Sequence, residues 1–283
     1  MLNCMTAIQV RGLTKRYADV NAVAGIDLDI HDGEIFALLG PNGAGKTTTV
    51  EILEGHRPRD GGEVTVLGVD PAHAPRSWRA EIGIVTQDAT DAGELTLTET
   101  VAHFARYYPR PRATADVIAT VGLTEHARRQ VRQLSGGQRR RLDVAIGVIG
   151  RPRVLFLDEP TTGFDPQARR QFWELIRHLA DDGTTVLLTT HYLDEAEALA
   201  GRVAVVASGR IVAEGAPATL GGRDHTASTV HWVDGGEPRQ EVTADPARVV
   251  GELTARFGGT VPGLSISRPS LEDTYLALIG ESR

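Results

Sequence analysis

The segment GPNGAGKTT, residues 40–48, constrains this chain more than any other feature. It follows an apolar run at 34–39, EIFALL, that is typical of a buried strand, and it precedes a run with helical character. The phosphate-loop pattern G-x-x-x-x-G-K-[ST] requires this setting, because its glycines let backbone N–H groups surround a phosphate at the start of a helix. The segment therefore predicts a strand–loop–helix unit that binds a nucleotide, rather than a glycine-rich turn that binds nothing.

Two side chains in this loop have chemical roles under that hypothesis. Lys46 is one of only two lysines in the chain, the other being Lys15, and we expect it to reach the β- and γ-phosphates. Thr47 would offer its hydroxyl to Mg²⁺. The predicted ATP-binding residues of the loop are Gly40, Asn42, Gly43, Ala44, Gly45, Lys46, Thr47 and Thr48.

A second motif, VLFLDEP at 154–160, supplies carboxylates. Its apolar strand would deliver Asp158 to the carboxyl edge of a parallel sheet, where ligands bind, so Asp158 is a predicted Mg²⁺ ligand. Glu159 lies one residue further and is the predicted general base for an attacking water. A helix cap or surface acid pair is the alternative, and the phosphate loop upstream weighs against it.

The hydrophobic pattern indicates an α/β fold with a largely parallel sheet, because strand-like and helical runs alternate. Expected strands lie at 26–30, 34–39, 82–86, 153–158, 184–190 and 202–209, and expected helices at 46–54, 97–107, 137–149, 166–180 and 193–200. A mainly helical insert is expected from about 88 to 150.

Composition narrows the class of protein. The net charge of -7 argues against a mainly electrostatic hold on nucleic acid, so no nucleic-acid partner is expected. The single cysteine, Cys4, has no partner for a disulfide, which fits a reducing cytosol. Residues 1–15 lack the apolar core of a signal peptide, and the apolar runs are shorter than the ~20 residues that span a bilayer.

The segment QLSGGQRRRLDVA at 133–145 resembles a second anion site. Small residues at the start of a helix leave backbone N–H groups free to bind an anion. This run has no lysine and no metal-binding carboxylate, and the chain already has a complete phosphate loop. The residues alone do not say which phosphate this second site would bind.

Taken together, GPNGAGKTT, LSGGQ, LFLDEP and TTH, in this order, resemble the ATP-binding subunit of ABC transporters. The resemblance covers roughly residues 7–220 and implies a P-loop NTPase fold of the ABC type, with the helical insert as its signature subdomain. We therefore expect residues 1–220 to form the nucleotide-binding domain.

The resemblance implies a partner for the second anion site. In the family two such domains pack head to tail, so Ser135, Gly136, Gly137 and Gln138 would act in trans on the ATP held by the other copy of a homodimer. Asp165 matches a loop that crosses the dimer interface, although Phe164 stands where leucine is usual.

Three further residues gain roles only through the resemblance. Gln87 matches a glutamine that contacts Mg²⁺ and transmits nucleotide state to the membrane partner, although a glutamine at a strand end is usually solvated. His191 matches a histidine that contacts the γ-phosphate, with a structural histidine as the alternative. Tyr17 matches an aromatic residue that stacks on adenine.

The tail, residues 221–283, is predicted to form a small α+β accessory domain after a boundary near 220. Its helix at 245–258 would begin with Asp245 as N-cap and end at Gly258, and Ser270 with Asp273 would cap the last helix. The ending PSLEDTYLALIG resembles the C-terminal extension of drug-exporter ATPases of the daunorubicin-resistance type. A dimer-stabilising appendage without influence on substrate choice is the alternative.

These observations lead to one functional hypothesis. The chain would hydrolyse ATP to power export of a drug, antibiotic or lipid-like compound through a separate membrane permease, from the cytoplasmic face of the membrane. The alternatives are an importer ATPase, a soluble ABC-type ATPase acting on ribosomes or DNA, and a nucleotide sensor without turnover. Phe104 and Tyr107, which follow Gln87 at helical spacing, would either dock on the permease or belong to the core.

Overall fold

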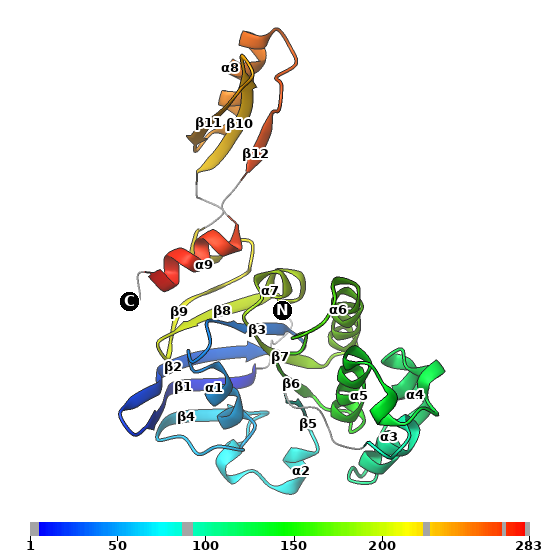
Figure 1. Cartoon of the computed structure of the whole chain (residues 1–283). Coiled ribbons are helices and arrows are strands. Elements are labelled where there is room, and N and C mark those ends of the chain that lie inside the picture. Colours follow the sequence, from blue (N-terminus) through cyan, green and yellow to red (C-terminus); the bar gives the residue numbers. More distant parts are fainter. Residues whose placement is uncertain (1–5, 87–92, 223–226, 268–269, 281–283) are drawn as a thin grey trace, which may run out of the picture.

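The computed structural model describes residues 6–86, 93–222, 227–267 and 270–280. A six-stranded sheet forms its centre, with the strand order β5-β6-β7-β3-β8-β9 (Figure 1). Its strands are β3 (Ile35–Leu39), β5 (Ile82–Val85), β6 (Val154–Asp158), β7 (Thr185–Thr190), β8 (Arg202–Ala207) and β9 (Arg210–Gly215). The first five run parallel and β9 runs antiparallel to β8. The expected parallel α/β sheet is confirmed.

Both faces of this sheet are covered by other elements. Successive side chains of a strand point to opposite faces, so neighbouring residues of one strand enter different clusters. Phe36 and Leu38 of β3 belong to one buried cluster, whereas Ala37 and Leu39 belong to the other. This two-sided burial explains why β3 and β6 read as apolar runs in the sequence, and in β7 it buries the threonines as well.

The first face packs on an antiparallel sheet with the order β2-β1-β4 and on helix α1. These elements are β1 (Thr6–Tyr17), β2 (Val20–His31), β4 (Gly61–Val66) and α1 (Lys46–Leu53). The expected strand at 26–30 is the end of β2, but β1 and β4 were missed. Buried and exposed positions are mixed along both strands, which gives them no continuous apolar run.

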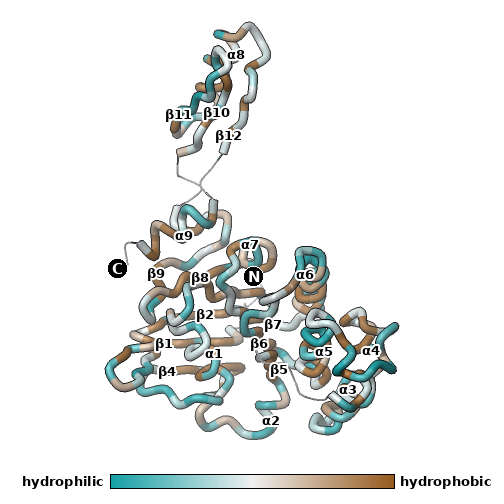
Figure 2. Tube along the Cα trace, in the orientation of Figure 1, coloured by the Kyte–Doolittle hydropathy of each residue, from teal (hydrophilic) through white to brown (hydrophobic). Residues whose placement is uncertain are grey.

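The other face carries most of the helices, including the signature subdomain. The helices on this face are α3 (Leu97–Ala105), α4 (Thr114–Thr120), α5 (Gly136–Val148), α6 (Pro166–Asp181) and α7 (Leu193–Leu199), whereas the short α2 (Arg76–Arg79) buries Trp78 in the cluster of the first face. Short 3₁₀ turns lie at Pro71–His73, Thr124–His126, Val131–Gln133 and Leu220–Gly222. Figure 2 shows hydrophobic and hydrophilic stretches alternating along α6, whose apolar side is buried against the sheet.

The C-terminal part contains a second, smaller antiparallel sheet with the order β11-β10-β12 and its own apolar cluster under a helix. Its elements are β10 (Ser228–Asp234), β11 (Glu237–Thr243), β12 (Ser265–Ser267) and α8 (Pro246–Phe257). Asp245 accepts a hydrogen bond from the backbone of Arg248 and Gly258 adopts a left-handed conformation, so the expected ends of α8 are confirmed. β11 was missed, since nearly all its residues are exposed.

The last helix, α9 (Leu271–Gly280), packs on the nucleotide-binding part rather than on the small sheet. Ser270 and Asp273 cap it as expected. Leu271 is buried within the same apolar cluster as β3 and α7, and Thr274 lies against Gly221. The domain boundary near residue 220 stays a prediction. A division there would leave α9 in the C-terminal part of the sequence although it packs on the nucleotide-binding part.

No helix among the described residues is long and apolar enough to span a bilayer.

Candidate nucleotide site

The phosphate loop joins the buried end of β3 to the first residue of α1. A Cβ atom on Gly40 would lie 2.3 Å from the carbonyl oxygen of Val206, and one on Gly45 would lie 2.1 Å from that of Ala22. Gly45 also has φ of 102°, a conformation that favours glycine. The glycines are therefore required by the close approach of neighbouring backbone.

Lys46 is buried at the centre of this loop, where its Nζ donates to the carbonyl oxygens of Gly40 at 2.7 Å and Pro41 at 3.1 Å. Burial lowers the pKa of the ammonium group, and the nearby carboxylates of Glu159 and Asp158 act in the opposite direction. The ammonium is thus held at the point where a bound phosphate would meet it.

A hollow of about 400 Å³ opens beside the loop. Its lining residues are Tyr17, Ala22, Asn42, Gly43, Gly45, Lys46, Thr47, Thr48 and Glu159. The Tyr17 ring lies at its rim, with Lys15 Nζ 5.6 Å and the Arg57 guanidinium 5.3 Å from the ring centroid. The fold therefore gathers most of the predicted ATP-binding residues around one space, with a flat aromatic face at its edge.

Asp158 ends β6 directly beside the loop. Its Oδ1 accepts from the hydroxyl of Thr189, and its Oδ2 lies 3.4 Å from Thr47 Oγ1. Carboxylate and hydroxyl oxygens are ligands that suit Mg²⁺, which commonly takes one or two protein carboxylates and completes its shell with water and substrate phosphates. The predicted pair Thr47 and Asp158 thus fits the ion, whereas Gln87 lies outside the described residues.

Glu159 and His191 face each other across the ends of β6 and β7. His191 Nδ1 lies 3.1 Å from Glu159 Oε1, and the Glu159 side chain is mostly buried. The Glu159 backbone has φ of 44°, and its N–H donates to Thr189 O and Oγ1 at 3.2 and 3.1 Å. Glu159 lines the same hollow as Lys46, so its carboxylate is placed to act near a bound phosphate.

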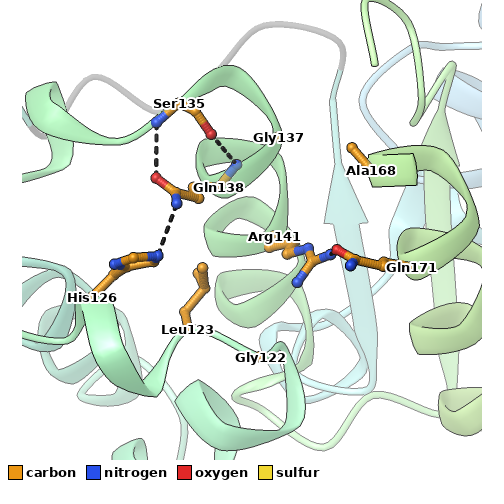
Figure 3. Close-up of a pocket in the computed structure, with 9 residues that line it drawn as sticks. All are labelled: Gly122, Leu123, His126, Ser135, Gly137, Gln138, Arg141, Ala168 and Gln171. Atoms are coloured by element: carbon orange, nitrogen blue, oxygen red, sulfur yellow. Dashed lines mark hydrogen bonds between the residues drawn. The ribbon is translucent and has the colours of Figure 1, made fainter. Parts of the chain in front are cut away.

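The signature residues 135–138 form the N-terminus of α5. Ser135 Oγ accepts from the Gln138 backbone, and Gln138 Oε1 accepts from the Ser135 backbone, which together make a capping box. Gln138 Nε2 also forms a hydrogen bond of 2.8 Å with His126 Nε2, drawn as a dashed line in Figure 3. The turn is therefore held by side chains of the signature subdomain itself.

The signature residues do not line the phosphate-loop hollow of their own chain. Ser135, Gly137 and Gln138 line a separate hollow of about 260 Å³ with Gly122, Leu123, His126, Arg141, Ala168 and Gln171, drawn in Figure 3. Gly136 borders a third hollow, together with Glu159 and Arg140. Within one chain, the two predicted anion sites therefore remain apart.

Asp165 caps α6, since its Oδ1 accepts from the backbones of Gln167 and Ala168 at 2.9 Å each. Its role in a dimer interface stays a prediction. Phe164, where leucine was expected, packs edge-to-face on Phe172, with 5.6 Å between ring centroids. Its bulk therefore fills space in this chain's own core.

Phe104 in α3 and Tyr107 just after it differ in burial. Phe104 packs against the main apolar cluster, whereas Tyr107 is exposed and lies within hydrogen-bonding distance of His103. Phe104 is partly buried against the core and Tyr107 is exposed, and docking on the permease stays a hypothesis for both.

Sequence reasoning missed two buried charged residues beside this site. Arg140 in α5 is only 7% exposed and donates to main-chain oxygens around Glu159, while burial lowers its pKa. Glu54, at the end of α1, lines a hollow with Thr47 and Asp158, and burial raises its pKa to about 8. Arg140 lies between two other arginines in the sequence, so nothing in the pattern singles it out.

Comparison with known proteins agrees with this geometry. The family description ABC transporter matches residues 23–162. The chain is 40% identical to the daunorubicin resistance ATP-binding protein DrrA2 of Streptomyces coeruleorubidus, covering 97% of this chain and 95% of that protein. It is 38% identical to the Nod factor export ATP-binding protein I of Rhizobium sp. (strain N33), covering 97% of each.

Solved structures agree on the fold. An ATP-binding subunit of an ABC transporter superposes with a TM-score of 0.70 at 23% identity, over 96% of this chain and 99% of that one. A protein from Clostridium perfringens, cbiO1 of the ABC transporter complex cbiONQ, gives a TM-score of 0.70 at 27% identity over 75% of this chain and 89% of that one.

Fold and site together define an ABC-type ATPase. The chain belongs to the ABC transporter family as an ATP-binding subunit, and its reaction is the hydrolysis of ATP. Subunits of this kind act with a membrane permease. The comparisons therefore do not favour the alternative hypothesis of an ATPase that acts on ribosomes or DNA.

Proposed function

We propose that this protein hydrolyses ATP at two composite sites of a homodimer and thereby drives export of a drug, antibiotic or lipid-like compound through a separate permease. In each site Lys46, Thr47, Asp158 and Gln87 hold the phosphates and Mg²⁺, and Glu159 accepts a proton from the attacking water. Bound Mg²⁺ supplies charge neutralisation on the phosphates. The protein lies on the cytoplasmic face of the membrane, bound to the permease.

The separation of the signature turn from the phosphate loop is the observation that carries the composite-site proposal. Ser135 and Gly137 line a hollow that contains none of the phosphate-loop residues. A helix N-terminus built from small residues, with no lysine in the turn, gains a function when a second copy brings a phosphate to it. A head-to-tail homodimer does this twice by symmetry.

The pair Glu159 and His191 supports the assignment of the base. A general base must reach the proton that it abstracts, and Glu159 lines the nucleotide hollow where the attacking water would lie, with its Oε1 3.1 Å from His191 Nδ1. His191 orients the carboxylate and contacts the γ-phosphate. Hydrolysis by the Glu159→Gln protein should fall by ~10²–10⁴-fold, the usual effect of losing a general base, while ATP binding persists.

Export and the class of substrate are supported by the relatives. Two proteins similar along nearly their whole length are named for daunorubicin resistance and for Nod factor export. One name states export and the other states resistance to a drug, which removal of that drug from the cell would provide. The similarity extends through the C-terminal region, so it is not limited to the motifs that every ABC ATPase shares.

Mixed dimers test the composite sites directly. Two differently tagged chains are co-expressed, purified through both tags and assayed for ATP hydrolysis. A dimer of Lys46→Ala with Ser135→Arg should retain one intact site, because both defects fall in the same composite site. A dimer of the double variant with wild type should lose both sites. If each chain used its own signature turn, the two results would be exchanged.

Transport is tested with the membrane partner. The tagged Glu159→Gln protein, which should be trapped as an MgATP-bound dimer, is used to recover the permease from detergent-solubilised membranes of the native host. The wild-type complex is then reconstituted in liposomes, and ATP-dependent movement of daunorubicin is followed by its fluorescence. Uptake by inverted complexes, absent with Glu159→Gln, supports export. Recovery of ribosomal or DNA-bound proteins instead of a membrane protein would contradict the transporter assignment.

A further inference from the structure

The Arg140 guanidinium is bound to the main chain at both sides of Glu159. It donates to the carbonyl oxygen of Asp158 at 2.7 Å and to that of Pro160 at 3.0 Å. A third hydrogen bond reaches the carbonyl oxygen of Thr86, just beyond the end of β5. One planar group thus connects α5 with the main chain that precedes and follows the proposed base.

Glu159 has a backbone conformation that needs such support. Its φ of 44° lies in the left-handed region, which residues with a Cβ atom rarely adopt. Strained conformations persist only where the surroundings over-determine them, and they cluster at active sites. The Glu159 N–H is held by Thr189 on the neighbouring strand, while Arg140 holds the flanking carbonyl groups.

Arginine is the side chain suited to this task. Its five donors lie in a fixed plane, so two or three acceptors can be bound with a defined geometry, whereas lysine offers a point charge on a flexible stem. Arg140 is 7% exposed, so little water is available to replace these bonds. Its neighbours on α5, Arg139 and Arg141, instead donate to Arg132 O and to Gln171 within the helical part of the chain.

A purely structural role is the alternative. The carboxylates of Asp143, Asp158 and Glu195 lie near enough to interact electrostatically with Arg140, so the arginine also balances buried negative charge. Charge balance alone would not require bonds to the two peptide carbonyls that flank one residue. The pattern of hydrogen bonds, rather than the charge, therefore favours a role in positioning Glu159 over a purely structural role.

We propose that Arg140 is a positioning residue for the general base, which fixes the backbone of residues 158–160 so that the Glu159 carboxylate faces His191 and the nucleotide. The proposal rests on the proposed role of Glu159. Because Ser135 begins the same helix, Arg140 also ties the base of one composite site to the signature turn that serves the other.

The first experiment compares Arg140→Met with wild type, using the full chain with its permease. Removing the donors while keeping an unbranched apolar stem should lower kcat by ~10²-fold, the cost of a misplaced catalytic group, while the Kd for ATP stays within roughly threefold. Arg177→Met is the matched control, since Arg177 also donates to a main-chain oxygen, that of Ala198, but does not line the hollows that contain Glu159. It should keep its kcat.

A double-mutant cycle distinguishes positioning from general damage. If Arg140 acts through the Glu159 carboxylate, Arg140→Met should slow the residual single-turnover hydrolysis of Glu159→Gln by no more than about twofold, because residues that act as a unit are not additive. A further loss of ~10²-fold in the Glu159→Gln background would overturn the proposal. Nucleotide binding measured on the same samples shows that both chains are folded.

Arg140→Lys covers the case in which Arg140→Met fails to fold. It keeps the buried charge but not the planar set of donors, so a lowered kcat with unchanged ATP affinity supports positioning, and a wild-type kcat overturns it. The two proposals fail separately. Normal turnover by Glu159→Gln would remove the base assignment itself, whereas an inactive Glu159→Gln beside fully active Arg140 variants would remove only the role of Arg140.

Discussion

His191 Nδ1 lies 3.1 Å from Glu159 Oε1, although the two residues are 32 positions apart in the sequence. They meet because β6 and β7 are adjacent and parallel, with Asp158 paired in register with Thr189. Parallel strands bring their carboxyl ends to one edge of the sheet, and this edge also receives the phosphate loop from β3. The imidazole therefore has a direct means of orienting the proposed base.

Replacing His191 by alanine should lower kcat by ~10²-fold, because the Glu159 carboxylate loses its orienting partner and the γ-phosphate loses a contact. ATP binding should change little, since the phosphate loop is intact. Steady-state hydrolysis at saturating MgATP, with nucleotide binding measured separately, checks this. His178→Ala, which alters an exposed histidine of α6, is the control. An unchanged kcat in His191→Ala would contradict the role.

Replacing Lys46 by methionine should weaken ATP binding by roughly 10- to 100-fold, the free energy of one or two charge-assisted hydrogen bonds. Lys46→Arg should fare no better. The buried ammonium donates to the carbonyl groups of Gly40 and Pro41, and the larger, planar guanidinium would have to displace these contacts. Isothermal titration with MgATP gives the affinities. Arg11→Met, which breaks the ion pair with Asp29 in the antiparallel sheet, is the control and should bind ATP normally.

Glu54 should make the stability of the protein depend on pH. Burial, with help from the nearby Asp158 and Glu51, raises its pKa to about 8 in the folded chain, whereas an unfolded glutamate ionises near 4.5. The contribution of Glu54 to the free energy of unfolding is therefore complete below about pH 4.5 and is lost as the pH rises through 8. The loss is at most about 1.4 kcal/mol per pH unit for one proton.

Denaturant unfolding of wild type and Glu54→Gln between pH 5.5 and 8.5 measures this effect. The neutral amide cannot ionise, so the variant should gain stability relative to wild type as the pH increases. Glu63→Gln, at an exposed position of β4, should follow wild type across the whole range. Parallel curves for Glu54→Gln and wild type would show that Glu54 ionises normally.

The packing of α9 on the nucleotide-binding part is tested by two leucines of that helix. Leu271 is 1% exposed, whereas Leu276 is 55% exposed. Leu271→Ala should lower the free energy of unfolding by ~2–5 kcal/mol through lost burial and a cavity. Leu276→Ala should change it by no more than ~0.5 kcal/mol. Equal effects in chemical denaturation would mean that α9 does not pack as the structure shows.

The local motifs and their order could be predicted from the sequence because their chemistry depends on short-range constraints. Gly40, Gly45 and Lys46 belong to one loop, and neither glycine position has room for a side chain. Strands buried on both faces appear as apolar runs, so the parallel sheet was predicted as well. The partly exposed strands β1, β4 and β11 escaped prediction because their side chains face water at many positions and leave no clear period.

The sequence by itself determined that this chain binds and hydrolyses ATP, since the phosphate loop, the signature turn and the strand-end carboxylates are each contiguous in the chain. Only the tertiary structure decided how these parts meet. The approach of His191 to Glu159, the hydrogen bonds from Arg140 to the carbonyl groups flanking Glu159, and the packing of α9 on the main apolar cluster join residues distant in sequence. Such contacts depend on strand order and burial, which arise only when distant segments of the chain pack together.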